Sequence, residues 1–185
     1  DAAEVVIDAA SGLQVGTERS WKLVEAKTLP RLIFINKTDR ENADIKKVTA
    51  DIIKKFGKKC VSISGALTEA QIESIAESDD KLIEKFLESG KLSDEEIKTG
   101  LSKAVLSGNI VPILSGSAEK GEGIKELLDF IVNYFSPPTV KEGPFSALVF
   151  KTVVDPYIGQ ISIFKVMSGS LMADANILNN TKGQK

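Results

Sequence analysis

Three polar residues with the spacing of a base-reading motif follow an apolar run of strand length. Asn36, Lys37 and Asp39 come directly after residues 31–35, and doubly wound folds bind ligands at the carboxyl ends of such strands. A carboxylate at Asp39 can accept two hydrogen bonds from guanine, one from N1–H and one from the exocyclic N2 amine. Adenine offers neither donor on that edge and would leave the carboxylate unpaired. The stem of Lys37 can lie along the base, and the Asn36 amide can tie the loop to its neighbours.

A second polar turn follows another apolar run. Ser117 and Ala118 come after residues 110–114 and before an amphipathic pattern. Small side chains in such a turn let backbone amides approach guanine O6, where adenine carries a donor amine instead. Together the two motifs predict a guanine site, with Asn36, Lys37, Asp39, Ser117 and Ala118 as its binding residues. The alternative interpretation is an ordinary solvated turn in which Asn36 and Asp39 are turn residues.

Composition excludes several other kinds of chemistry. The 185 residues include no histidine, so catalysis by a histidine acid or base and histidine metal sites are excluded within this chain. One cysteine is too few for a structural zinc site, and Cys60 and Trp21 are expected in the core. Apolar residues make up 42% and charged residues 27%, which is typical of a soluble globular protein. No apolar run approaches the roughly 20 residues that a membrane span requires, so no membrane partner is expected.

The spacing of apolar residues predicts an α/β fold. Strands are expected at 4–9, 31–35 and 110–114, with a short strand at 60–63. A helix from 16 to 28 between the first two strands completes a βαβ unit. Helices are also expected at 45–56 and 124–135, and Thr68, Ser78 and Ser93 are candidate N-caps of helices between them. Antiparallel strands are expected at 147–150 and 161–166, and 176–178 is strand-like.

These elements divide the chain into three expected regions. Residues 1–39 and 110–138 are expected to form a parallel sheet with helices. Residues 40–109 are expected to be mostly helical, and residues 144–185 to begin a second domain with antiparallel strands. The chain starts on a strand at Asp1 and ends in a turn, so we expect an excised piece of a longer protein. A sheet without its first strands exposes an edge, so self-association is also expected.

Nearly the whole chain resembles bacterial elongation factor G, a translational GTPase. The matching stretches are 1–18, 29–44, 78–87, 110–118, 145–151 and 155–159. The resemblance implies part of a P-loop-type GTPase domain, with residues 1–39 and 110–138 as its C-terminal half and residues 40–109 as a mostly helical insertion. It implies that residues 144–185 are the first strands of a β-barrel domain. It assigns Asn36, Lys37 and Asp39 to contacts with guanine, and Ser117 and Ala118 to the same pocket. The insertion at 40–109 is shorter than in the family.

The resemblance also implies a function for the parent protein. It would be a cytoplasmic, GTP-hydrolysing ribosomal translocase that moves tRNA and mRNA during protein synthesis. Its ligands would be GTP or GDP with Mg²⁺, and its partners ribosomal RNA and stalk proteins. The chain has no Gly-x-x-x-x-Gly-Lys-Ser/Thr pattern and lacks the family's catalytic histidine and Mg²⁺ ligands. We therefore expect it to carry only the guanine-recognition half of the site and not to hydrolyse GTP alone.

Two alternatives to the translocase remain open. In the first, the parent protects ribosomes or is a specialised paralogue of elongation factor G, since the short insertion departs from the family. In the second, the chain is a non-enzymatic module that docks on ribosomes without turnover.

Overall fold

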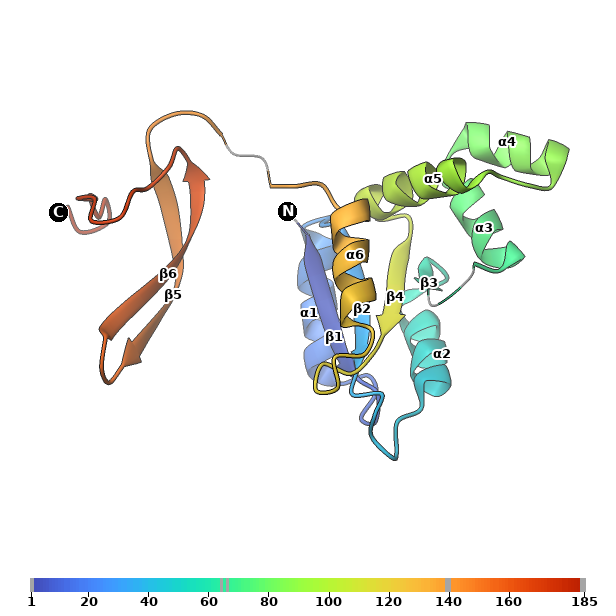
Figure 1. Ribbon diagram of the computed structural model, residues 1–185, viewed down its shortest axis with the longest axis horizontal. Coiled ribbons are helices and arrows are strands. Elements are labelled where there is room, and N and C mark those ends of the chain that lie inside the picture. Colours follow the sequence, from blue (N-terminus) through green and yellow to red (C-terminus); the bar gives the residue numbers. More distant parts are fainter. Residues whose placement is uncertain (1, 64, 66, 139–140, 184–185) are drawn as a thin grey trace. The chain divides into compact units, whose positions relative to one another are not determined.

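The computed structural model describes residues 2–63, 65, 67–138 and 141–183. The chain forms two compact units, Asp1–Pro137 and Pro138–Lys185, which are described separately. The first unit combines a parallel sheet with helices, and the second contains a β-hairpin (Figure 1).

A four-stranded parallel sheet is the centre of the first unit. Its strand order is β1-β2-β4-β3. The strands are β1 (Ala3–Asp8), β2 (Arg31–Asn36), β3 (Cys60–Ser62) and β4 (Val111–Ser115). Pro112 lies in β4 although proline has no amide proton to donate to a ladder, and the pairing of β4 with β2 begins one residue later, at Ile113. The predicted α/β class and the four predicted strands of this unit are confirmed.

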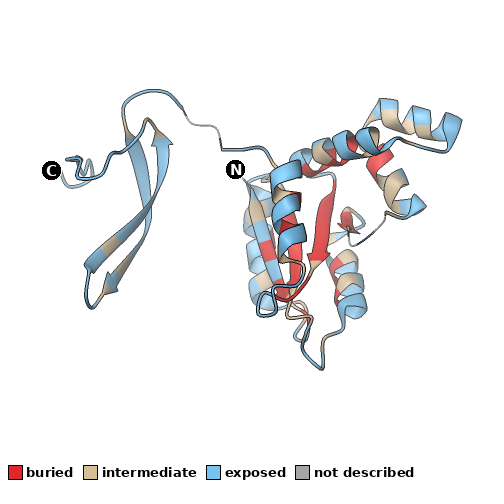
Figure 2. Ribbon diagram, viewed as in Figure 1, coloured by how far each residue is buried: buried red, intermediate tan, exposed pale blue. Residues whose placement is uncertain are grey.

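Helices cover both faces of the sheet. The helices of this unit are α1 (Val15–Ala26), α2 (Ile45–Phe56), α3 (Glu69–Ala76), α4 (Asp80–Ser89), α5 (Asp94–Ser107) and α6 (Ile124–Tyr134). Of these, α4 buries no residue and packs on α3. One core cluster joins Trp21 of α1 and Ile52 of α2 to the sheet, and Cys60 belongs to it. The other joins Leu101 of α5 and Phe130 of α6 to the opposite face. Every residue from 31 to 35 is buried, as Figure 2 shows for the central strands, because β2 is covered on both sides.

The observed N-caps can be compared with the three predicted from the sequence. Thr68 and Ser93 each form a capping box, so these two predictions are confirmed. The prediction for Ser78 is wrong, because Asp79 caps α4 by accepting a hydrogen bond of 3.1 Å from the Lys81 amide. The Ser78 hydroxyl instead donates to the carbonyl of Ile75, 2.6 Å away at the end of α3.

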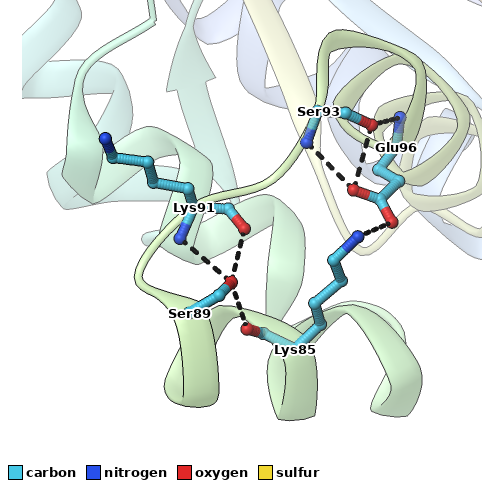
Figure 3. Close-up of polar contacts among 5 residues, drawn as sticks. All are labelled: Lys85, Ser89, Lys91, Ser93 and Glu96. Carbon is cyan, nitrogen blue, oxygen red and sulfur yellow. Dashed lines mark hydrogen bonds and ion pairs between the residues drawn. The ribbon is translucent and has the colours of Figure 1, made fainter.

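The turn between α4 and α5 is held by side chains from both helices (Figure 3). Glu96 Oε2 accepts hydrogen bonds from the Ser93 amide at 2.9 Å and the Ser93 hydroxyl at 3.0 Å. Glu96 Oε1 pairs with Lys85 Nζ at 2.5 Å, and this contact with Lys85 is the main reason that the pKa of Glu96 falls to about 2. Ser89 Oγ lies 2.7 Å from the carbonyl of Lys85 and 2.8 Å from that of Lys91. These contacts fix how α4 leads into α5.

The second unit contains an antiparallel hairpin of β5 (Ser146–Asp155) and β6 (Gly159–Ser168). At the turn, Asp155 Oδ1 accepts hydrogen bonds from the amides of Ile158 and Tyr157, which lower the pKa of Asp155. Both predicted strands are confirmed, and each extends to ten residues. The strand expected at 176–178 is wrong, since those residues form no strand. None of the described residues 141–183 is buried.

Candidate functional site

The carboxyl ends of β2 and β4 bring the two sequence motifs together. Ile35 and Ser115 are in register, and the Gly116 amide donates to the Ile35 carbonyl at 2.9 Å. The Thr38 amide in turn donates to the Gly116 carbonyl at 3.3 Å. The loop after β2 and the turn after β4 are therefore joined by backbone hydrogen bonds. All five predicted site residues lie in these two segments, at one edge of the sheet.

The side chain of Asn36 links the two motifs directly. Its Oδ1 atom accepts a hydrogen bond of 2.7 Å from the Lys37 amide and one of 3.0 Å from the Ala118 amide. The second bond joins residues 82 positions apart in the chain. Asn36 therefore ties its loop to a neighbouring loop, as its amide was predicted to do.

Lys37 adopts a backbone conformation that is unusual for a residue with a side chain. Its φ is 63°, in the left-handed region, which costs about 1–2 kcal/mol for an L-residue. Its ammonium lies 2.7 Å from Asp8 Oδ2, at the end of β1. Asp8 Oδ1 also accepts from the amides of Ala10 at 2.9 Å and Ser11 at 3.1 Å. These contacts, the Lys37 hydrogen bond first among them, lower the pKa of Asp8 to about 2.

Asp8 is a site residue that sequence reasoning missed. It is in register with Asn36 across the β1–β2 pair, so its carboxylate reaches the loop that carries Lys37. Arg40 Nη1 is a more distant neighbour, at 3.9 Å from Asp8 Oδ2. A sequence signal for Asp8 was available. Asp8 is the last residue of β1, just before the turn that leads to α1, and Asn36 is likewise the last residue of β2.

Asp39 is held by a buried serine from the second motif. A hydrogen bond from the Ser117 hydroxyl is the main reason that the pKa of Asp39 is lowered. Ser117 is fully buried, and its oxygen accepts from the Lys120 amide at 3.2 Å. Asp39 itself is exposed. It is therefore ionised at neutral pH and able to accept hydrogen bonds from a ligand.

Two glycines allow the turn after β4 to close tightly. A Cβ atom on Gly116 would lie 2.2 Å from the carbonyl oxygen of Glu122. Gly123 has a φ of 73°, and a Cβ there would lie 2.4 Å from the carbonyl oxygen of Ser115. The Ser117 amide donates to Glu122 at 2.9 Å, which closes the turn. Only glycine fits at these two positions, so close backbone packing fixes the turn that carries Ser117.

In the part of the chain that the structure describes, the arrangement offers hydrogen-bond donors and acceptors rather than a cluster of metal ligands. Among the described residues, no group of three or more His, Cys, Asp or Glu side chains could hold a metal ion. These described side chains therefore do not fit Mg²⁺. A cleft of about 650 Å³ between the β1–α1 loop and α2 contains none of the five predicted residues. No described helix is long and apolar enough to span a membrane.

The fold agrees with comparisons to known proteins. Residues 1–137 match the model of the elongation factor Tu GTP binding domain. The chain belongs to this family of translational GTP-binding domains.

Among its relatives are elongation factors G. That of Thermotoga maritima is 32% identical over 249 residues, which covers all of this chain and 36% of the relative. That of Thermotoga petrophila is 31% identical with the same coverage. A crystal structure of a Thermus thermophilus protein matches with a TM-score of 0.77 and 27% identity, over 91% of this chain and 32% of that one.

The resemblance to elongation factor G is therefore confirmed, and the chain is an elongation factor G-like translational GTPase sequence. It spans just over a third of the length of the elongation factors G that it matches. The matched region of these relatives has 249 residues against the 185 of this chain, so they are longer within it.

Proposed function

We propose that this chain provides the guanine-recognition part of the nucleotide site in a ribosomal translocase of the elongation factor G type. The parent protein would use GTP to promote movement of tRNA and mRNA during protein synthesis. The observation that supports this most is the contact between the two motifs, in which Asn36 Oδ1 accepts from the Ala118 amide and the Gly116 carbonyl accepts from the Thr38 amide. If the loop after β2 were an ordinary solvated turn, a side-chain hydrogen bond to a residue 82 positions away would not be expected.

The proposed recognition follows from the atoms that the site exposes. The ionised Asp39 carboxylate accepts from N1–H and the N2 amine of guanine, and the hydroxyl of Ser117 holds it in place. The stem of Lys37 lies along the base while its ammonium stays with Asp8. The Ala118 amide already donates to Asn36 Oδ1, so guanine O6 reaches it as a second acceptor or by displacing Asn36. Adenine would bring an amine to that position and leave Asp39 unpaired.

Exchanging Asp39 for asparagine tests this assignment. In Asp39→Asn the side-chain oxygen still accepts from N1–H, but the amide NH₂ now faces the guanine amine. Xanthine carries an oxygen at that position and pairs with the new amide. We expect GDP affinity to fall at least ~10-fold and xanthosine diphosphate to become the preferred ligand, because unpaired polar groups are strongly rejected.

Titrations by NMR or calorimetry with GDP, ADP and xanthosine diphosphate up to millimolar concentration measure this change. Asp51→Asn is the matched control, since Asp51 is exposed on α2. Unchanged GDP binding by Asp39→Asn would refute the site. Equal binding of GDP and ADP by the unaltered chain would do the same.

The remaining parts of the proposal concern partners and location. We propose ribosomal RNA and stalk proteins as partners, GTP with Mg²⁺ as the ligand of the parent protein, and the cytoplasm as its compartment. We also propose self-association through β1, which is an edge strand of the sheet and carries Val6 at 54% exposure. Sedimentation velocity at rising concentration tests this, and a constant monomer would contradict it.

A further inference from the structure

The chain concentrates positive charge on and just after α2. Residues 44–59 hold six lysines and two aspartates, so their net formal charge is +4 in a chain whose total is −2. The lysines are Lys46, Lys47, Lys54, Lys55, Lys58 and Lys59.

Two of these lysines pair with acidic residues that the structure describes, and four do not. Lys55 pairs with Glu18 and Lys59 with Glu25, each at 2.8 Å. Within the described part of the chain, the other four side chains have no ion pair or hydrogen bond, and all are exposed. These four, which we call the α2 lysine face, are Lys46, Lys47, Lys54 and Lys58.

The helix directs this face to solvent. At 100° per residue, Lys46, Lys47 and Lys54 lie on the half of α2 opposite Val48 and Ile52, which are buried against the sheet. Lys47 and Lys54 are two turns apart, about 10.5 Å along the helix axis. Unpaired charges at such separations suit a row of separate anions better than one compact ligand.

The α2 lysine face lacks an anchor for a protein partner. Stable protein interfaces centre on buried aromatic or large apolar side chains. Phe56, the aromatic residue of α2, is stacked on Trp21 with ring centroids 4.1 Å apart. Apart from Ile45, which is 38% exposed in the first turn, the large apolar side chains of α2 are buried or half-buried. With no free aromatic ring, the face cannot stack on bases either, so it fits a phosphate backbone.

Charge elsewhere in the same unit favours one orientation on such a polyanion. Residues 69–96, which include α3 and α4, hold ten acidic residues and three lysines. This segment, with a net charge of −7, is repelled by a phosphate backbone that attracts α2. The two opposite charges would turn α2 toward a polyanion and the acidic helices away from it.

We propose that the α2 lysine face binds the phosphate backbone of double-helical RNA, without reading its sequence. The inference rests on the proposed function, which makes ribosomal RNA a partner. The inference adds to that function the surface that would contact RNA. This surface is separate from the carboxyl ends of β2 and β4, where Asn36 and Asp39 lie.

Salt-dependent binding to a defined RNA tests the proposal. Fluorescence anisotropy with a labelled RNA duplex of about 20 base pairs compares the full chain with a variant that carries Gln at all four positions of the face. Each phosphate contact contributes about 0.9 to the slope of log K against log salt. The affinity of the unaltered chain should fall on the order of 100-fold between about 50 and 200 mM KCl. The slope of log K against log salt should be smaller by about 3–4 for the variant than for the unaltered chain.

A control variant separates the surface from net charge. Lys22→Gln, Lys27→Gln, Lys151→Gln and Lys182→Gln remove the same charge from exposed positions outside α2. This control should bind RNA within about threefold of the unaltered chain, and far-UV circular dichroism checks that both variants fold. Equal losses in the two variants, or no loss in the α2 variant, would overturn the proposal.

A second probe distinguishes RNA from an acidic protein. Poly-glutamate of similar charge should bind at least ~10-fold more weakly than the duplex, because its charges are less densely spaced than RNA phosphates. Equal or tighter binding would assign the face to an acidic protein and overturn the RNA proposal. If the unaltered chain recognises GDP but does not bind the RNA duplex, this inference alone is refuted. Failure of the Asp39→Asn experiment concerns the proposed function instead.

Discussion

The contact between Asp8 and Lys37 is expected to stabilise the fold in a way that depends on pH. Asp8 receives the Lys37 ammonium at 2.7 Å and two backbone amides. Replacement by asparagine keeps an oxygen for the amides of Ala10 and Ser11 but removes the negative charge. Asp8→Asn therefore isolates the electrostatic part of the contact.

The size of the effect follows from the pKa of Asp8, which falls from an ordinary value of 3.8 to about 2. A shift of one unit corresponds to about 1.4 kcal/mol, so the shift sets an upper limit of about 2 kcal/mol. The Asp8 side chain is 21% exposed and that of Lys37 44%, so solvent screens part of this energy. We expect Asp8→Asn to lower the free energy of unfolding at pH 7 by about 1–2 kcal/mol.

The sign of the pH dependence is fixed by the direction of the shift. A lowered pKa means that the unfolded state binds the proton more tightly, so the stabilisation is complete above the unfolded pKa near 3.8. It is lost as pH falls from there toward about 2. The difference between the unaltered chain and Asp8→Asn should be constant above about pH 5 and close to zero near pH 2.

Urea unfolding followed by tryptophan fluorescence measures this difference. Trp21 is the one tryptophan of the chain and is 4% exposed in the same core cluster as Val5 and Ile7, so its emission reports the unit that contains Asp8. Asp51→Asn is the control, since the Asp51 side chain forms no ion pair with any described residue. A difference that is the same at pH 7 and pH 2.5, or a loss at pH 7 no larger than in the control, would refute the reasoning.

Three further predictions concern the turn, the link between the motifs and the insertion. Gly116→Ala places a Cβ 2.2 Å from the Glu122 carbonyl, so the melting midpoint should fall by the equivalent of about 1–3 kcal/mol in calorimetry. Asn36→Ala removes the acceptor of the Ala118 amide, and amide hydrogen exchange at Ala118 should rise about 10-fold, a change absent from a distant amide. Ser93→Ala removes the cap of α5 and should cost about 1 kcal/mol in urea unfolding, while Ser89→Ala should cost less.

Much of the candidate site could be predicted because it depends on local pattern. The runs at 31–35 and 110–114 have the length of strands and are too short for typical helices. The polar residues that follow each run are therefore expected at the ends of strands. Once both strands are parallel members of one sheet, their carboxyl ends share an edge. The structure places Asn36, Lys37, Asp39, Ser117 and Ala118 in joined segments at that edge, while guanine binding stays a prediction.

Contacts between distant parts of the chain could not be predicted in this way. The placement of β4 between β2 and β3 depends on how whole strands pack, which no local pattern reveals. Asp8 and Lys37 are 29 residues apart, and their pairing depends on the β1–β2 register. At the start of α4, both Ser78 and Asp79 are residue types that cap helices. Asp79 also accepts from Lys103 Nζ of α5 at 2.9 Å, a tertiary contact invisible in the sequence.

The strained backbone of Lys37 is held in place by contacts of its own side chain and of Asn36. Glycine would adopt a φ of 63° without steric cost, whereas lysine there costs about 1–2 kcal/mol. The lysine side chain offsets that cost because its ammonium pairs with Asp8, and Asn36 Oδ1 accepts from the Lys37 amide at 2.7 Å. Both contacts lie within the protein, so the left-handed turn is set before any base arrives. A guanine would therefore meet a loop already held in place, and little of its binding energy would be spent on ordering the loop.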